Sequence, residues 1–359
     1  MPIFESSSIT NIALHRVGNR QTEEGFILSK GEIPINDALQ DLLIKYFISP
    51  FKAEEYYHLY HEENVELNPI FHRCANIFAD PTCLMEESQQ IARHLYDSCL
   101  HPNIKGGDLW VVYFSECQLN GESTRAIGIF KSENTESFLK VLHNDEEWSR
   151  AENDMSATAA FKLEVHQGIN INKLDKGALI FDMEEEDGYI VSVVDATNRS
   201  QDAAYWRDEF LHIRQREDEY YNTHAELSAY KRFVTERLPE EFENVEKADR
   251  ADLLNRSVNY FKQNDQFDID SFAEEVIQQP EVIESFRQFR NDYQKENEVV
   301  LQDQFDINEE AVKKQARNFK SVIKLDKNFH IYVHGSSNLI EKGCDEKGKF
   351  YKVYYSEES

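Results

Sequence analysis

The residues whose types and spacing could do chemistry are basic side chains near the C-terminus. Within AVKKQARNFK, Lys313, Arg317 and Lys320 recur at intervals of four and three residues, so a helix would carry them on one face. Cations in this arrangement suit the phosphates of a nucleic-acid backbone, which they contact without reading the bases. The pattern predicts a DNA-contacting set of six residues: Lys313, Lys314, Arg317, Lys320, Lys324 and Lys327.

The charge of the whole chain makes this basic cluster unusual. The 359 residues include 39 lysines and arginines against 67 aspartates and glutamates, a formal charge of −28, which by itself disfavours contact with phosphates. Residues 311 to 359 reverse the sign, with ten basic and six acidic residues, so the other 310 residues carry −32. A second interpretation stays open, because charge runs are usually solvated faces and these lysines could interact with acidic residues of the same protein.

Two histidines and a group of aspartates give weaker signals for metal binding. His58 and His61 in HLYHEE would share a face if this segment were helical, but no companion ligand is evident, so a solvated polar face is the simpler interpretation. DQFDID has alternating acids but lacks the glycine and the distal glutamate of a calcium loop. We therefore predict that Asp268 or Asp270 caps a helix.

Catalytic signatures are scarce in this sequence. The chain has no P-loop, GxGxxG, GxSxG or HExxH pattern. Glu164 and Asp182 lie on or beside expected strands, where a metal-dependent nuclease could hold two carboxylates, but no convincing lysine stands at the following partner position. The nuclease interpretation is therefore the weakest, and we expect no enzymatic activity, no bound metal and no cofactor.

The composition is typical of a large globular protein. With 40% hydrophobic and 12% aromatic residues, the chain can bury a substantial core, and no apolar run approaches the roughly 20 residues of a membrane helix. The N-terminal MPIFESSSITN lacks the basic and apolar regions of a signal peptide, so we expect a cytoplasmic protein. The five cysteines show no close pairing such as CxxC, which favours reduced thiols over disulfides or a zinc site.

Residues 1 to 215 are predicted to form a mixed domain built on a largely antiparallel sheet. Its β-rich runs have a period of two, and most of the connections between them are too short for a crossover helix. The expected strands are 9–17, 25–30, 108–117, 124–132, 160–168, 177–183 and 188–196. Helices are expected at 36–48, behind an Asn36 cap, and at 84–100. The apolar positions expected to face the core from the first helix are Ala38, Leu42 and Phe47.

Beyond residue 215 the pattern becomes helical and then returns to strands. Residues 216 to 305 are predicted to form an acidic helical region; positions 201 to 300 carry 24 acidic and 13 basic residues, a net of −11. Residues 306 to 359 are predicted to form a basic helix, capped by Asn308, followed by a small sheet. This sheet would consist of a hairpin, which turns at DKN, and a third strand at 349–355. The stripe expected to anchor this helix is Val312, Ala316 and Phe319. The three regions together predict an α+β fold.

The order of these elements resembles that of one known family. The early IALH strand at 12–15, the segment GYIVSVVDATNRSQDAAYWRDEFL at 188–211 and the terminal ARNFKSVIKLDKNFHIYVHG at 316–335 follow one another across nearly the whole chain. In this order they resemble the bacterial nucleoid-associated proteins of the NdpA-like or YejK-like family. The similarity is carried by apolar patterns and a few polar positions. The matching positions are His15, Arg199, Phe210, Phe319, Ile323 and Ile331, most of them framework residues.

The resemblance implies association with the bacterial nucleoid and DNA binding, with no catalytic motif to carry over. We therefore expect a non-catalytic protein that binds double-stranded DNA with little sequence preference, with a homodimer as an open possibility. An alternative stays open, in which the acidic body binds a basic DNA-processing protein and reaches the nucleoid through that partner. Binding of the purified protein to DNA would separate the two.

Overall fold

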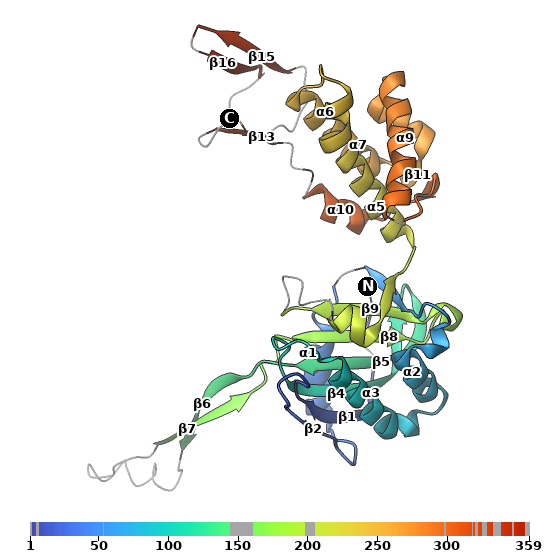
Figure 1. The fold of residues 1–359 in the computed structure, drawn as a ribbon. Helices are drawn as coiled ribbons and strands as arrows, with labels where there is room; N and C mark the ends of the chain where they lie inside the picture. The colour runs from blue at the N-terminus through green and yellow to red at the C-terminus, as the bar shows by residue number, and fades with distance from the viewer. Residues whose placement is uncertain are drawn as a thin grey trace, which may run out of the picture. The chain divides into compact units, whose positions relative to one another are not determined.

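The computed structural model of the protein covers most of the chain. The described residues are 2–4, 7–52, 54–143, 161–197, 205–297, 299–317, 319, 322–324, 329–332, 339–346 and 348–355. The chain divides into two compact units, Met1–Arg216 (unit 1) and Glu217–Ser359 (unit 2), which each contain helices and strands (Figure 1). The predicted α+β class is confirmed. The division into three domains at residues 215 and 305 stays a prediction.

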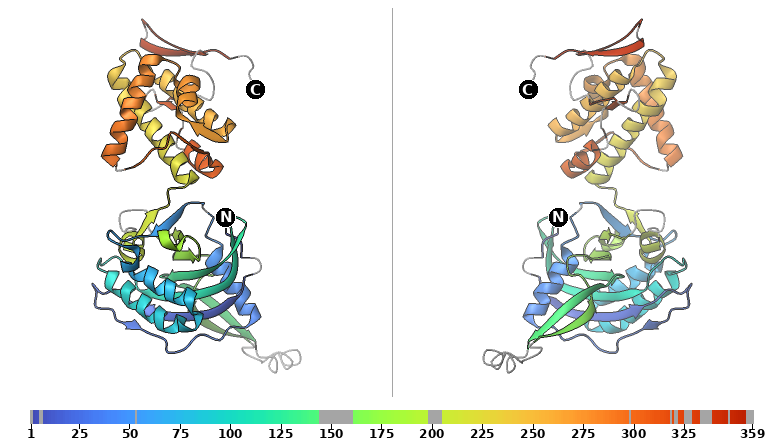
Figure 2. Two further views of the ribbon diagram at one scale, coloured as in Figure 1. Left: turned by 90° about the vertical axis from the view of Figure 1, so that its right-hand side faces the viewer. Right: turned by 90° about the vertical axis from the view of Figure 1, so that its left-hand side faces the viewer.

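An antiparallel sheet of eight strands forms the centre of unit 1 (Figure 1; Figure 2). Its strand order is β10-β3-β9-β8-β5-β4-β1-β2, and each neighbouring pair is antiparallel, as predicted. The strands are β1 (Ile9–Val17), β2 (Phe26–Ile27), β3 (Tyr56–Leu59), β4 (Gly107–Leu119), β5 (Glu122–Ser132), β8 (Lys176–Phe181), β9 (Ile190–Asp195) and β10 (Ile213–Gln215). Asn120 and Gly121 both have positive φ, 52° and 86°, which gives the β4–β5 turn the twist that an antiparallel hairpin needs.

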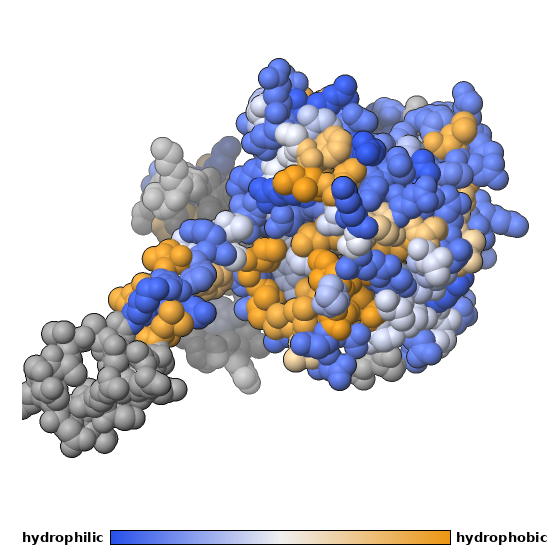
Figure 3. Space-filling model, turned by 90° about the horizontal axis from the view of Figure 1, so that it is seen from below, coloured by the Kyte–Doolittle hydropathy of each residue, from blue (hydrophilic) through white to orange (hydrophobic). Residues whose placement is uncertain are grey.

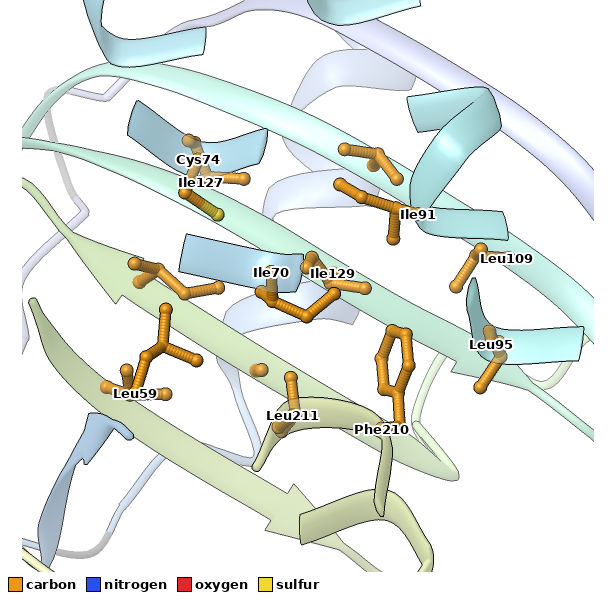
Figure 4. Packing of buried hydrophobic residues seen from close by; sticks show 14 of the residues in the cluster. Leu59, Ile70, Cys74, Ile91, Leu95, Leu109, Ile127, Ile129, Phe210 and Leu211 are labelled. Atoms are coloured by element: carbon orange, nitrogen blue, oxygen red, sulfur yellow. The ribbon is translucent and has the colours of Figure 1, made fainter. Parts of the chain in front are cut away.

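The sheet of unit 1 has an apolar core on each face. Successive residues of β4 alternate between the two cores, since Leu109 and Val111 belong to one and Val112 and Phe114 to the other. The helices of this unit are α1 (Asp37–Ile48), α2 (Pro69–Ala79), α3 (Leu84–Ser98), the 3-10 turns Val65–Leu67, Pro81–Cys83 and Glu185–Asp187, and the π-helical segment Tyr205–Leu211. Helix α1 packs on the face of the sheet that carries Val112 and Phe114. The other face, with Leu109, is covered by α2, α3 and the π-helical segment, as Figure 4 shows.

The core-facing side of α1 differs from the predicted one. The Asn36 side chain accepts a hydrogen bond from the Leu39 N–H, which confirms the cap. Phe47 stacks on Phe130 of β5 with ring centroids 4.3 Å apart, and this contact sets the rotation of the helix. At about 100° per residue, Leu42 then points roughly 140° away from Phe47. Accordingly Leu42 and Ala38 are exposed, so the predicted stripe is wrong at both positions. The buried residues of the helix are Leu43, Tyr46 and Phe47.

A separate hairpin extends from unit 1 (Figure 1; Figure 3). It pairs β6 (Glu136–His143) with β7 (Phe161–Gly168), so the strand predicted at 160–168 lies outside the main sheet. One face of the hairpin is apolar, and Figure 3 shows its hydrophobic side chains in orange. The residues of this face are Leu139, Val141, Leu163 and Val165, exposed by 45 to 71%. They pair across the strands, Leu139 with Val165 and Val141 with Leu163.

Unit 2 is mainly helical, as predicted for the middle of the chain. Its helices are α5 (Glu219–Arg232), α6 (Leu238–Glu241), α7 (Lys247–Gln263), α8 (Ile269–Phe272), α9 (Pro280–Asn297), α10 (Glu309–Ala316) and the π-helical segments Phe233–Arg237 and Ala273–Ile277. An aromatic cluster fills its core, where Tyr230 meets Phe272 and Phe286 edge-on at 4.9 and 5.3 Å. Across the described residues, no helix is both long and apolar enough to cross a membrane.

Three short strand pairs complete unit 2. They are β11 (Gln266–Asp268) with β12 (Gln304–Asp306), β13 (Val322–Lys324) with β14 (His330–Tyr332), and β15 (Ile340–Asp345) with β16 (Gly348–Val353). The hairpin predicted around DKN is confirmed by the pairing of Ile323 with Ile331, although its turn lies outside the described residues. The prediction that 349–355 adds a third strand to this hairpin is wrong. Residues 349–353 of that segment belong to β16, which pairs with β15, the strand that precedes it in the chain.

Two predicted helix caps in unit 2 are confirmed. The Asp268 side chain accepts a hydrogen bond from the Ser271 N–H at the start of α8, so Asp268 of DQFDID caps this helix. The Asn308 side chain accepts from the Ala311 N–H at 3.0 Å and begins α10. Both signals are local in the sequence, which is why they could be recognised there.

Candidate nucleic-acid interface

Helix α10 is anchored to unit 2 by its apolar side. Val312 and Phe319 are almost fully buried in the aromatic core, and Ala316 packs against the same cluster, which confirms the predicted stripe. Phe319 follows the last helical residue, Ala316, so the stripe continues past the end of the helix. The cations Lys313, Lys314 and Arg317 are exposed. The structure therefore brings half of the six candidate residues together at one short, firmly packed helix.

The two lysines of α10 already contact groups of the same chain. Lys313 Nζ lies 2.9 Å from Glu310 and 3.3 Å from Glu309, and hydrogen bonds to these carboxylates raise the pKa of Lys313. Lys314 donates a 2.8 Å hydrogen bond to the Tyr220 hydroxyl, and its ammonium lies 5.5 Å from the centre of that ring. Lys314 therefore helps to hold α10 against α5, whereas Lys313 forms exposed ion pairs.

The remaining candidate residues follow α10. Lys324 is the last residue of β13, where its backbone pairs with that of His330. Lys320 and Lys327 lie outside the described residues. On the neighbouring strands, Lys342 is 2.8 Å from Glu246 and Lys352 is 3.6 Å from Glu341. Acidic groups of the same unit thus lie close to several of its cations, as the second interpretation expected.

The histidines considered as metal ligands have other partners. His58 lies in the strand β3 rather than in a helix, with Nε2 2.8 Å from Glu184. Glu184 also accepts hydrogen bonds from Arg216 at 2.6 and 2.9 Å, and Arg216 and His58 together lower the pKa of Glu184. His61 Nε2 lies 4.0 Å from Glu62. In the part of the chain that the structure describes, no three or more His, Cys, Asp and Glu side chains meet as a metal site.

The two carboxylates of the nuclease interpretation lie in different sheets. Glu164 is on the β6–β7 hairpin, where Lys162 and His166 are within 2.7 and 3.2 Å. Asp182 follows β8 of the main sheet and accepts a 2.9 Å hydrogen bond from Arg125 Nε. Each carboxylate therefore has basic partners of its own, and the geometry gives no support to a joint metal site.

A buried charged cluster at one end of the main sheet was missed by the sequence reasoning. Lys131 of β5 and Lys176 of β8 are opposite each other and fully buried. Lys131 Nζ lies 3.0 Å from Glu133, and Lys176 Nζ lies 2.8 Å from Asp195. Both ammonium groups lie over the ring of Tyr205, at 5.4 and 5.2 Å. The one signal in the sequence is a lysine at the end of each apolar run, GIFK and KGALIF.

This buried cluster has a structural role that its contacts explain. Lys131 also donates to the Lys105 carbonyl at 2.7 Å and to the Tyr205 hydroxyl at 3.1 Å. Burial raises the pKa of Tyr205, so its hydroxyl stays protonated and donates to Glu133. Removing one partner of a buried ion pair strongly destabilises the folded protein, because the other charge stays buried without compensation. The cluster therefore fixes the π-helical segment Tyr205–Leu211 against the ends of the strands.

Comparison with known proteins identifies the family. The family model described as nucleoid-associated protein YejK matches residues 13–349, which include parts of both units and α10. No curated protein matches the sequence. Because the match extends over nearly the whole chain, the resemblance noted in the sequence is confirmed. The chain belongs to the family of the nucleoid-associated protein YejK.

Proposed function

We propose that this protein associates with the nucleoid by binding double-stranded DNA directly, with little sequence preference. The observation that carries the proposal is the exposure of Lys313, Lys314 and Arg317 at a helix whose apolar side is buried in unit 2. Because the helix is anchored, its backbone is already ordered, and only the side chains lose conformational freedom when they meet phosphates. Phosphate contacts position a protein on a duplex but carry no sequence information. Membership of a nucleoid-associated family supports the same role.

The distribution of charge supports contact at the C-terminal end. Residues 1 to 310 carry −32 and would repel a duplex, whereas residues 311 to 359 carry +4. Three further basic residues extend the proposed surface along the chain: Lys320, Lys324 and Lys327. Together with the cations of α10 they offer about three to six phosphate contacts, which corresponds to modest affinity.

The ion pairs of Lys313 are compatible with this proposal. Lys313, Glu309 and Glu310 are exposed by 58, 85 and 53%. Ion pairs between exposed charges contribute little to stability, so a phosphate can replace a carboxylate at little cost. The two glutamates still repel the incoming backbone, which is a further reason for modest affinity.

A triple variant tests the proposed surface. Lys313→Gln, Arg317→Gln and Lys320→Gln leave the buried stripe untouched and spare Lys314, which holds Tyr220. We expect weaker binding to a duplex and a salt dependence reduced by about 3 in the slope of log K against log salt.

A matched control removes three charges elsewhere. Lys52, Lys105 and Lys173 are exposed in unit 1, and their replacement by glutamine changes the net charge by the same amount. We expect this control to bind DNA almost as the unchanged protein does. Equal weakening in both variants would show that total charge, rather than the α10 surface, governs binding. Unchanged binding by the α10 variant would remove this surface from the proposal.

A second candidate function is recruitment to the nucleoid through a basic protein. It is favoured by the net charge of −11 over residues 201 to 300 and by the acidic partners of Lys313, Lys342 and Lys352. On this alternative the purified protein does not bind DNA at physiological salt. No enzymatic step is proposed for either candidate.

A further inference from the structure

Unit 2 contains an open cavity of about 1000 Å³ that is lined by no residue of α10. Its walls come from α6 and the loop that follows, from α7, and from the turn between the π-helical segment Ala273–Ile277 and α9. Gln278 forms part of this turn and has φ of 69°, a left-handed conformation that is strained for a residue with a side chain. This turn ends one helix and lets α9 begin at Pro280, and Gln278 and Gln279 of the turn line the cavity.

The cavity has an apolar part, its floor, beside five amide side chains: Asn244, Asn255, Asn259, Gln278 and Gln279. The floor consists of side chains that also belong to, or pack against, the aromatic core of unit 2. These residues are Leu238, Phe242, Val245, Leu253, Ile277 and Val282. Phe242 and Val245 are only half-buried, so they are the part of the floor that a ligand can still cover. An apolar floor of this kind accepts apolar side chains.

The rim of the cavity is acidic. Four acidic residues and one arginine line it, a formal charge of −3: Glu241, Glu243, Asp249, Asp252 and Arg256. Arg256 Nε lies 3.0 Å from Asp252, so the single cation of the rim is already compensated. Glu241 lies 2.5 Å from Arg237, while Glu243 is exposed. Glu241 and Asp252 therefore each already have a cation, and the attraction of the rim for a further cation comes mainly from Glu243 and from the net negative charge of residues 201 to 300.

We propose that this cavity is a docking site for a basic segment of another protein that carries apolar anchor residues. The anchors would cover Phe242 and Val245, and lysines or arginines beside them would face Glu241 and Glu243. A buried apolar centre with a charged, complementary rim is the usual arrangement of such interfaces. The volume admits more than one side chain. This site is independent of DNA binding by α10, and it supplies a defined surface for a basic partner.

Fluorescence anisotropy with synthetic peptides tests the proposal on the full chain. The probe is a labelled twelve-residue peptide of Lys, Arg, Leu and Phe, with the apolar residues spaced at i, i+3 and i+4. Two matched peptides replace either Leu and Phe by Ser, or Lys and Arg by Glu. We expect a Kd on the order of 10 to 100 µM for the first peptide at 50 mM salt, and binding at least about tenfold weaker for the other two.

Variants of the protein locate the binding. Glu241→Gln with Glu243→Gln should weaken the first peptide about fivefold, because two rim charges are lost. Glu274→Gln with Glu284→Gln removes two exposed acids that do not line the cavity, and should leave the affinity unchanged. Val245→Ser should weaken binding about threefold, because the floor of the cavity loses apolar surface that the peptide would cover. Circular dichroism confirms that each variant is folded.

The outcomes separate this proposal from its competitors. Equal binding of the peptide without apolar residues, or equal effects of the two glutamine pairs, would overturn it in favour of general charge attraction. Displacement of the peptide by spermidine at matched charge concentration would assign the cavity to a small polycation instead. DNA binding measured in parallel should not change in the cavity variants, so a failure of the DNA proposal and a failure of this one give different results.

Discussion

Glu226 and Arg290 form an ion pair inside unit 2, in which Arg290 Nε lies 3.0 Å from Glu226 Oε2. Glu226 is fully buried, and Arg290 also donates to Asp303 at 2.5 Å and to the Gln302 carbonyl at 2.6 Å. The pair joins α5, which contacts α10, to α9 and to the segment before β12. Among the described residues Glu226 Oε1 has no hydrogen-bond partner, and burial raises the pKa of Glu226 to about 7.

The raised pKa of Glu226 predicts a pH-dependent stability. Its value of about 7 in the folded protein is above the ordinary 4.5, so the folded state keeps a proton that the unfolded chain releases. The resulting contribution to the free energy of unfolding is fully present below pH 4.5 and is lost as the pH rises through about 7. Between pH 6 and 8 the free energy of unfolding should therefore fall by about 1 kcal/mol. Urea unfolding should show this loss in the unchanged protein and its absence in Glu226→Gln; identical pH dependence in both would contradict it.

Removing Arg290 should destabilise unit 2 strongly. Arg290→Ala leaves Glu226 buried without its cation, for which we expect a loss of about 3 to 5 kcal/mol in the free energy of unfolding. Arg287→Ala is the matched control on the same helix, since Arg287 pairs with Asp270 at the surface and should contribute less than about 1 kcal/mol. Thermal unfolding of both variants checks the difference. Comparable losses in the two variants would mean that the buried ion pair stabilises unit 2 no more than the surface pair does.

The apolar residues of the core and of the β6–β7 hairpin should respond differently to truncation. Leu95 of α3 is fully buried in the core that Figure 4 shows, and Leu95→Ala should cost about 2 to 5 kcal/mol. Leu139 on the hairpin is 63% exposed, and Leu139→Ala should change stability by less than about 0.5 kcal/mol in the monomer. Chemical denaturation measures both. A large loss for Leu139→Ala would mean that the hairpin face is covered in solution.

Nuclease activity is expected to be absent. Glu164 and Asp182 lie in different sheets with basic partners of their own, so they do not form a two-carboxylate site. Incubation of the purified protein with supercoiled and linear DNA in Mg²⁺ or Mn²⁺ should leave the DNA intact. Cleavage that disappears in Glu164→Ala or Asp182→Ala would overturn this expectation.

Local signals in the sequence predicted more than long-range ones did. The Asn36, Asp268 and Asn308 caps and the strand β1 were all found, because each depends on residues close together in the chain. The face of α1 was assigned wrongly because it depends on Phe130, a residue of a distant strand. The pairing of β16 failed for a similar reason, since periodicity does not say which strand is the neighbour.

The candidate sites show the same distinction. Exposure of the basic side of α10 followed from its apolar stripe, which is a property of one helix. The cluster of Lys131 and Lys176 could not be predicted, because it needs the register of β5 and β8. The acidic cavity was also missed, since its floor and rim come from three separate helices and the turns between them.

The salt dependence of DNA binding by the purified full chain tests direct contact most directly. Equilibrium binding to two duplexes of unrelated sequence, measured from 50 to 300 mM salt, gives the slope of log K against log salt. With about three to six phosphate contacts we expect a slope of roughly −3 to −5, nearly equal for the two duplexes. Absence of binding by the purified protein even at 50 mM salt, or affinity that does not change with salt, would contradict direct contact with the DNA backbone.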